Sequence, residues 1–193
     1  MENINNCIRM YQACLVSRKE ELEQIAALSA QNLRTVVSAT EKKEQGFITW
    51  EYPLALLEAM HAIAPSVIIK QGEQVAGFAL TATQEMTRVH PELAVMLQNL
   101  QTLTYNNQPI LAHRLYMMGQ ICIDKAHRGK GLFDLLYQHH KAVYSKQYDL
   151  LLTEISTSNH RSLRAHQRVG FETIHTYHDH LDEWDVVVWK FEV

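Results

Sequence analysis

A glycine-rich turn in the second half of the chain combines residue types that bind phosphate. Residues Leu115–Ile123 are apolar and predict a strand, and the Gly129–Gly131 step then leads into an amphipathic helix. The first backbone N–H groups of a helix lack intrahelical partners and carry partial positive charge, so they can bind an anion. Arg128 and Lys130 add positive charge at the same turn. The spacing therefore predicts a site for a phosphorylated ligand.

Two common phosphate-binding motifs do not fit this turn. No Gly-x-x-x-x-Gly-Lys-Ser/Thr sequence occurs, and a dinucleotide-binding turn would need a third glycine besides Gly129 and Gly131. For this segment alone, a turn that the glycines ease without any ligand is an equal alternative. The downstream sequence favours the binding site.

A second polar element follows about thirty residues downstream, after the apolar segment Leu150–Ile155, which predicts a buried strand. A short helix is expected from His160 to Val169, with Asn159 as its N-cap and Gly170 as its left-handed C-terminal residue. Asn159, Ser162 and His166 are spaced i, i+3 and i+7. These three side chains should therefore share one helix face.

Together the two elements resemble the GNAT superfamily of N-acetyltransferases. The segment Arg128–Leu132 is similar to the family's pyrophosphate-binding Arg/Gln-x-x-Gly-x-Gly/Ala signature. The segment from Asn159 through Ser162 and His166 to Gly170-Phe171 is similar to its Asn-containing helix that ends in Gly-Phe. The motifs cover Leu115 to Phe171, and the strand pattern extends from about Pro65 to the C-terminus. Two positions depart from the family pattern: Phe133 replaces the last small residue of the loop, and His166 replaces the usual tyrosine acid.

The resemblance implies an α/β (α+β) fold. We expect a mixed, mostly antiparallel central sheet of six to seven strands flanked by helices, with a splayed strand pair that holds the cofactor. A single domain is expected over residues 1–193, with an N-terminal helical cap (1–64) and a cofactor-binding core (65–193). Gly119 lies inside the predicted central strand, where a glycine is typical of a bulge or a close backbone approach. In the family this strand separates from its neighbour and the gap receives the pantetheine arm; a bulge in a closed sheet is the alternative.

Acetyl-CoA is the cosubstrate that the resemblance implies, with no metal. Backbone groups of the strand end would bond the amides of the pantetheine arm, and the glycine turn would hold the pyrophosphate. Capping alone also explains Asn159, so its role as a ligand is open. The predicted cofactor-binding residues are Ile121, Cys122, Ile123, Arg128, Gly129, Lys130, Gly131, Leu132, Phe133, Asn159 and Ser162.

The implied reaction moves an acetyl group directly to a primary amine within a ternary complex. We predict His166 as the acid that protonates the leaving thiolate, because a histidine titrates near neutral pH; packing on the helix face is the alternative. Glu154 is the predicted base, because it lies near the end of the strand that leads to Asn159. A solvated strand face is the alternative for Glu154. The Ile123 N–H is the predicted oxyanion donor. Weaker base candidates are Glu51, Glu85 and His113.

Charge and composition fit an ordinary soluble globular protein. The formal net charge is −3 and the pI is about 6.4, which argues against a nucleic-acid-binding protein. No apolar run is long enough to span a membrane. Positive charge is instead concentrated near the turn and the following helix, which suits an anionic cofactor. The residues of this cluster are Lys125, Arg128, Lys130, Arg161, Arg164 and Arg168.

The cysteines predict a reducing compartment. Cys7, Cys14 and Cys122 are odd in number, have no paired spacing and follow no export signal, so a cytoplasmic location is expected. Cys122 lies in the apolar strand and is predicted to be a buried, inert thiol.

A metal site is a weaker hypothesis. His175, His178 and His180 lie close together near Asp179 and Asp182, but no zinc-binding spacing is present. Scattered surface histidines are the preferred interpretation.

The remaining elements are expected from capping and turn patterns. A capping box at Ser17-Arg18-Lys19-Glu20 predicts a helix start, and the polar stretch Glu41–Gly46 predicts a mobile loop. Other expected elements are a strand at Met10–Val16, a helix from Pro53, a hairpin of Val67–Lys70 with Gln74–Thr81, a helix at Glu92–Leu103, and strands at Phe171–His180 and Asp185–Glu192.

Two alternative functions remain beside the acetyltransferase. A non-catalytic acyl-CoA-binding sensor with the same fold would explain the missing tyrosine, and a structural or metal-binding protein would explain the histidines. The acceptor is expected to be a small-molecule or peptide amine, with no nucleic-acid or membrane partner, and a homodimer is possible. Aromatic and methionine side chains that could line an acceptor pocket are Trp50, Tyr52, Met86, Tyr105 and Tyr177.

Overall fold

A computed structural model of the chain describes residues 10–192, so Cys7 lies outside the described residues. The strands are β1 (Gln12–Leu15), β2 (Val67–Gln71), β3 (Gln74–Ala82), β4 (Thr104–Tyr105), β5 (Gln108–Pro109), β6 (Leu115–Ile123), β7 (Leu150–Ser156), β8 (Glu172–His178) and β9 (Glu183–Lys190). The α-helices are α2 (Lys19–Gln31), α3 (Ala39–Gln45), α4 (Leu54–His61), α5 (Pro91–Leu100), α6 (Leu132–Tyr144) and α7 (His160–Val169). Short 3₁₀ helices are η1 (Gln84–Arg88), η2 (Ile110–Ala112) and η3 (Lys125–His127).

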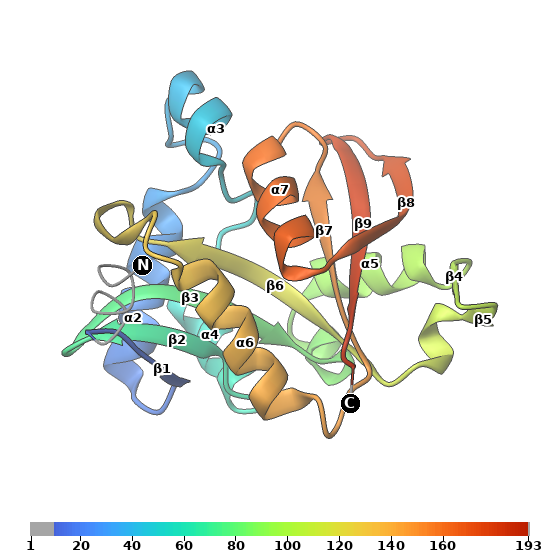
Figure 1. Cartoon of the computed structure of the whole chain (residues 1–193), viewed down its shortest axis with the longest axis horizontal. Coiled ribbons are helices and arrows are strands. Elements are labelled where there is room, and N and C mark those ends of the chain that lie inside the picture. The colour runs from blue at the N-terminus through green and yellow to red at the C-terminus, as the bar shows by residue number, and fades with distance from the viewer. Residues whose placement is uncertain (1–9, 193) are drawn as a thin grey trace.

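One large sheet organises the chain, with seven strands in the order β1-β2-β3-β6-β7-β9-β8. The β6–β7 pair is parallel, whereas the other neighbouring pairs in this sheet are antiparallel. The sheet is open, and helices flank it (Figure 1). The predicted fold class is therefore confirmed. The segment predicted as a helical cap also contributes an edge strand, because β1 pairs with β2.

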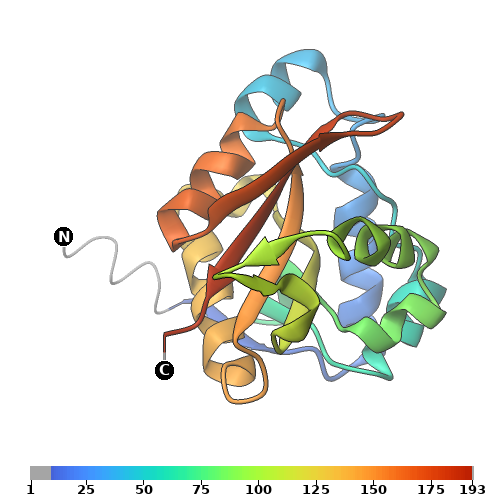
Figure 2. The same cartoon turned by 90° about the vertical axis from the view of Figure 1, so that its right-hand side faces the viewer.

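Helices cover both faces of the sheet. α6 and α7 lie on one face, and α2, α4 and α5 lie on the other (Figure 2). Strand alternation divides the apolar side chains of β6 between the two faces. Leu115 and Met117 pack in one apolar cluster, and Tyr116 and Met118 pack in the other. Because both faces are covered, β6 is a nearly continuous apolar run rather than an alternating one.

The central pair β6 and β7 separates after a short region of pairing. The two strands pair over Leu115–Met117 with Leu150–Leu152 and then diverge (Figure 1). At the branch point the Thr153 hydroxyl donates a hydrogen bond to the Met118 carbonyl, at 3.0 Å. The resulting gap leaves backbone groups of both strands without a strand partner, which suits a ligand that can pair with them. The predicted separation of the strand pair is confirmed.

Gly119 shapes the start of this gap. The register between β3 and β6 shifts between Ala79 and Thr81, which confirms the predicted bulge in the strand. The Tyr52 hydroxyl donates to the Gly119 carbonyl at 3.1 Å. A Cβ atom at this position would lie 2.9 Å from the same hydroxyl oxygen. A larger residue here would therefore force Tyr52 to move from its hydrogen-bonded position.

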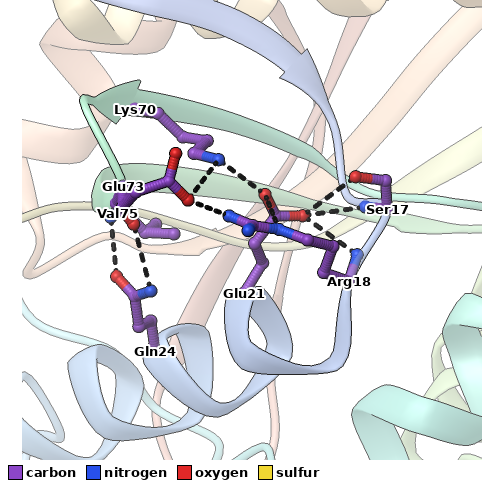
Figure 3. Close-up of polar contacts among 7 residues, drawn as sticks. All are labelled: Ser17, Arg18, Glu21, Gln24, Lys70, Glu73 and Val75. Carbon is purple, nitrogen blue, oxygen red and sulfur yellow. Dashed lines mark hydrogen bonds and ion pairs between the residues drawn. The ribbon is translucent and has the colours of Figure 1, made fainter.

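A polar cluster around the buried carboxylate of Glu21 attaches the start of α2 to the β2–β3 hairpin (Figure 3). The Glu21 carboxylate accepts hydrogen bonds from the Ser17 and Arg18 backbone N–H groups, at 2.8 and 3.1 Å, and from Lys70 Nζ at 2.9 Å. Arg18 pairs with Glu73 in the hairpin. The predicted helix start is correct, but Glu21 rather than Glu20 reaches back to the cap. A one-residue shift puts the carboxylate on the face that meets Lys70.

One prediction about local structure is wrong: the polar stretch Glu41–Gly46 is not a loop but lies mostly in α3. Ser38 caps this helix, because its hydroxyl accepts from the Glu41 N–H at 3.2 Å and the Glu41 carboxylate accepts from the Ser38 N–H at 3.2 Å. This reciprocal capping box was present in the sequence as Ser-x-x-Glu. Charged composition alone was therefore a poor guide to flexibility.

Several element boundaries also shift. The third predicted helix ends at Leu100 instead of Leu103 and is followed by the small β4–β5 hairpin. The last strand begins at Glu183 instead of Asp185, because Glu183 already pairs with His178 across the turn. Helix α7 and strand β6 have the predicted bounds.

Candidate functional site

Two cavities of about 550 and about 540 Å³ meet where β6 and β7 diverge. The basic cavity, which arginines line, lies at the glycine turn. The acidic cavity, which carboxylates line, lies on the side of α5 and the β8–β9 hairpin. The residues that line both are Phe47, Ile48, Ile121, Asn159 and Ser162. A ligand in one cavity can therefore approach a ligand in the other through the gap between the strands.

The glycine turn forms one wall of the basic cavity. Gly129 and Gly131 have φ values of 75° and 77°, in the left-handed region that side-chain-bearing residues rarely adopt. Gly131 immediately precedes α6, so the first N–H groups of that helix lie at the cavity. The partial positive charge of the helix start suits a phosphate group at this position.

Four arginines line the same cavity: Arg128, Arg161, Arg164 and Arg168. Burial lowers the pKa of Arg161, and the positive charges of Arg128, Arg164 and Arg168 lower it further. Arg168 pairs with Asp134 at 2.9 Å, which offsets part of the charge. An anion in the basic cavity would relieve the mutual repulsion of these guanidinium groups.

Most of the predicted cofactor-binding residues line the basic cavity. They are Ile121, Cys122, Ile123, Arg128, Gly129, Gly131, Leu132, Phe133, Asn159 and Ser162. Lys130 is the exception. Its Nζ donates to the Tyr11 hydroxyl at 3.0 Å and to the Ala126 carbonyl at 3.1 Å, on the outer side of the turn. Lys130 therefore does not line the basic cavity, and its side chain instead connects the turn to Tyr11.

The end of β6 presents backbone groups to the gap. The Asp124 N–H donates to the Ala76 carbonyl, the residue before Gly77 on β3, at 2.9 Å. Since successive residues of a strand point their backbone groups to opposite sides, Ile121 and Ile123 point theirs away from β3. The Ile123 carbonyl accepts from Arg128 Nε at 3.0 Å. This arrangement leaves Ile121 and the Ile123 N–H on the gap side of the strand.

Cys122 is buried, as predicted, and burial raises the pKa of its thiol to about 12. The thiolate is therefore a negligible species at neutral pH, and the side chain acts as a small apolar group.

Asn159 connects α7 to the segment after α3. Its Oδ1 accepts from the Ser162 N–H at 3.3 Å, which confirms the predicted helix cap, and its Nδ2 donates to the Phe47 carbonyl at 3.1 Å. A Cβ at Gly46 would lie 2.8 Å from Asn159 Oδ1, so the close approach requires glycine. Asn159 thus holds Phe47 and Ile48 at the boundary of the two cavities. No local sequence signal indicated that this N-terminal segment reaches the site.

His166 is buried between α6 and α7, with both ring nitrogens in hydrogen bonds. Nδ1 lies 2.8 Å from the Ser162 carbonyl, which can only accept, so Nδ1 carries the proton. Nε2 then accepts from the Tyr137 hydroxyl at 2.7 Å. Burial lowers the pKa of His166 to about 4. The proton-donor role of His166 stays a prediction, and this geometry favours a role in positioning α7.

Glu154 lies on β7 and lines the acidic cavity. The pKa of its carboxyl is raised to about 7, because burial and the negative charge of Asp179 raise it by more than the hydrogen bond with the Tyr177 side chain lowers it. Its Oε1 has no hydrogen-bond partner within the described part of the chain. A carboxylate with this pKa can accept a proton near neutral pH.

The acidic cavity has the opposite charge to the basic cavity. Its ionisable lining includes the carboxylates Glu92, Glu154 and Asp179, and no lysine or arginine is among its described lining residues. Trp50, Tyr52 and Tyr177 also line it, as anticipated, whereas Met86 and Tyr105 line neither cavity. The weaker base candidates Glu51, Glu85 and His113 line neither cavity.

Among residues 10–192, no three His, Cys, Asp or Glu side chains gather as a metal ion would require. Within the same range no helix has the length and apolar character needed to cross a membrane.

Comparison with known proteins now identifies the family. The family model described as "Acetyltransferase (GNAT) family" matches residues 22–171, which include the glycine turn, the β6–β7 gap and α7. The chain belongs to the GNAT acetyltransferase family. No curated protein sequence matches this GNAT chain.

Solved structures, two of them named as acetyltransferases, share the fold at low sequence identity. Ard1 from Thermoplasma volcanium superposes with a TM-score of 0.66 at 12% identity, covering 95% of this chain and 99% of that one. The ribosomal-protein-S18-alanine N-acetyltransferase from Escherichia coli gives 0.64 at 11% identity, covering 95% of each chain. The putative acetyltransferase yncA from Salmonella typhimurium, solved with its cofactor acetyl-CoA, gives 0.59 at 13% identity, also covering 95% of each chain. At these identities the likeness concerns the fold alone.

Proposed function

We propose that this chain is an N-acetyltransferase that moves an acetyl group from acetyl-CoA directly to a primary amine in a ternary complex. The observation that carries the proposal is the meeting of two cavities of opposite charge at the β6–β7 gap. The basic cavity suits the phosphates of coenzyme A, and the acidic cavity suits a protonated amine. The gap between them is where the thioester and the amine would meet.

The residues of the basic cavity fit acetyl-CoA. The N–H groups at the start of α6 and the guanidinium groups of Arg128, Arg161 and Arg164 would hold the phosphates. The backbone groups of Ile121 and Ile123 would pair with the amides of the pantetheine arm, as a strand partner would. The use of acetyl-CoA by the structural neighbour yncA supports this assignment.

Glu154 is proposed as the general base. An amine reaches the acidic cavity as an ammonium ion and must lose a proton before its nitrogen can attack the thioester carbonyl carbon. Glu154 takes that proton, directly or through a water molecule. The new C–N bond forms, the C–S bond breaks and coenzyme A leaves as a thiolate, while the nitrogen releases its second proton to solvent and becomes the neutral amide. The N–H groups of Ile121 and Ile123 both lie on the gap side of β6, and whichever of them does not bond the pantetheine arm would stabilise the oxyanion.

The leaving thiolate need not take its proton from His166. Both nitrogens of this neutral ring are used within the protein, as donor to Ser162 and as acceptor from Tyr137. A thiol has a pKa of about 8.5, so the thiolate can leave and take a proton from water near neutral pH. We therefore propose a positioning role for His166.

A second candidate function is acyl-CoA binding without catalysis. It is favoured by one observation: at the position where the family usually has a tyrosine acid, His166 carries no proton that faces the gap. Turnover with any amine would exclude this alternative.

Three further expectations belong to the proposal. The acceptor is a small-molecule or peptide amine, the protein works in the cytoplasm, and a homodimer is possible. Free thiols at Cys14 and Cys122 support a reducing location.

Calorimetric titration with acetyl-CoA tests the cofactor site, with Gly131→Asp as the disabling variant. Aspartate there adds strain at a left-handed φ and a negative charge at the phosphate position. Gly72→Asp is the matched control, because Gly72 also has a positive φ (59°) but lies in the β2–β3 turn. Micromolar binding that is lost only in Gly131→Asp supports the proposal, and an amine panel then tests turnover. No binding to the folded wild-type protein would refute it.

A further inference from the structure

The acidic cavity contains a second buried acceptor atom in addition to Glu154. His90 lies immediately before α5, its side chain is only 3% exposed, and it lines this cavity. Within the described part of the chain, neither His90 Nε2 nor Glu154 Oε1 has a hydrogen-bond partner. Buried polar atoms are rarely left unpaired, so these two acceptors at one cavity point to a ligand that donates to both.

The hydrogen-bond pattern defines the protonation of His90. Its Nδ1 lies 2.8 Å from Glu92 Oε2. An ionised carboxylate only accepts, so Nδ1 carries the hydrogen atom and donates it. Burial lowers the pKa of the ring and the charge of Glu92 raises it, with a net lowering that keeps the ring neutral at pH 7. Nε2 is then a bare lone pair that can accept a hydrogen bond but cannot donate one.

The ring of His90 is held in place from two sides. Glu92 binds Nδ1, and the Tyr52 ring packs against the imidazole at an angle of 73° with 5.1 Å between centroids. Tyr52 is itself fixed by its hydrogen bond to the Gly119 carbonyl. The position of Nε2 is thus set before any ligand arrives, which favours specific recognition.

Charge and polarity define what such a ligand should be. The carboxylates of the cavity are Glu92, Glu154 and Asp179, and none of its described lining residues is a lysine or arginine. Burial raises the pKa of Asp179, but the Trp184 side chain and hydrogen bonds from the Asp182 and Leu181 N–H groups, at 2.9 and 2.7 Å, lower it overall and favour the ionised carboxylate. The same cavity is also lined by the apolar side chains of Leu93, Met96, Met118 and Ile155. A ligand with cationic groups joined by an apolar spacer matches this lining.

We propose that the amine acceptor is a diamine, with its reacting nitrogen at Glu154 and its second ammonium group donating to His90 Nε2. This inference rests on the proposed acetyl transfer and adds the class of acceptor. His90 is then a specificity-determining residue, and Glu92 is the residue that orients it.

The test compares linear α,ω-diamines with monoamines and amino alcohols of equal chain length, as acceptors for acetyl-CoA. We expect kcat/KM of the best diamine to exceed that of its matched monoamine at least tenfold, the effect of about one hydrogen bond to a charged group. His90→Phe should reduce this ratio to near unity, mainly through the KM of the diamine. His90→Gln, which keeps an acceptor oxygen on the side chain, should retain a preference. His113→Phe is the matched control, because His113 also packs edge-on against a tyrosine but lies outside both cavities.

The outcomes separate the two proposals. If wild-type protein acetylates no amine, the proposed function fails. If it acetylates monoamines or amino alcohols as well as diamines, the enzyme stands and the diamine assignment is wrong. An unchanged diamine preference in His90→Phe would also overturn the role of His90. Acetyl-CoA titration of each variant establishes that the protein is folded, because the cofactor binds in the other cavity.

Discussion

Replacing Glu154 with glutamine should impair catalysis and stabilise the protein at the same time. Burial raises the pKa of this carboxyl from 4.5 to about 7, so the folded state holds the proton more tightly than the unfolded state does. Ionisation of Glu154 therefore opposes folding: the penalty is absent below about pH 4.5 and reaches its full value above about pH 7. At about 1.4 kcal/mol per pH unit, the full penalty is about 3 kcal/mol.

The assay is urea unfolding of wild type and Glu154→Gln at about pH 5.5 and about pH 8.5. Glutamine does not titrate, so the free-energy cost of ionising a buried carboxyl is absent in the variant. Between those pH values its stability relative to wild type should rise by about 2 kcal/mol. The expected loss of kcat/KM is about 10²- to 10⁴-fold, the usual contribution of a general base. In wild type, kcat/KM should rise with pH and level off above about 7, and this rise should be absent in the variant.

Glu51→Gln is the control, because Glu51 is exposed and lines neither cavity. It should change neither activity nor the pH dependence of stability. If Glu154→Gln retains wild-type kcat/KM, Glu154 is not the base. If the stability difference does not change with pH, the inferred pKa of Glu154 is wrong.

Three further outcomes are expected for the cofactor site and His166. Ser162→Ala should weaken acetyl-CoA binding by about 1 kcal/mol, since one neutral hydrogen bond is lost; an unchanged Kd in calorimetry would exclude that contact. Arg164→Gln should weaken acetyl-CoA binding about tenfold or more and reduce its salt dependence, because a charge at the phosphates is removed. Arg114→Gln, which removes an exposed arginine paired with Asp149 away from the cavities, should leave Kd unchanged; equal effects of the two substitutions would contradict the assignment. His166→Phe should keep the pH dependence of kcat even if the rate falls, because the ring packs but donates no proton to the thiolate; loss of one limb of the pH profile would restore His166 as the acid.

Local sequence patterns were sufficient for the elements that carry the cofactor site. Strand β6, the turn with Gly129 and Gly131, and helix α7 with its Asn159 cap all occur as predicted. Each depends on interactions between residues close in sequence, such as capping and glycine backbone freedom. The segment Glu41–Gly46 was predicted as a loop from its charged composition, although the local capping box of Ser38 and Glu41 indicates the helix that is observed.

Local sequence patterns could not predict side-chain directions or contacts between residues distant in sequence. Lys130 has the right charge at the right turn, yet its side chain bonds Tyr11 from the N-terminal region. His166 has the right helical position, but its Nε2 is occupied by the Tyr137 hydroxyl across the helix interface.

The order of strand, turn and helix, the placement of positive charge near the turn and the resemblance to acetyltransferases were all present in the linear chain. The acceptor side was decided only by folding. Glu154 acquires its raised pKa from burial, and it shares a cavity with His90 because α5 and the last hairpin close over the same end of the sheet. Burial and unpaired acceptor atoms arise from packing between segments distant in sequence. No periodicity or motif within one segment encodes them.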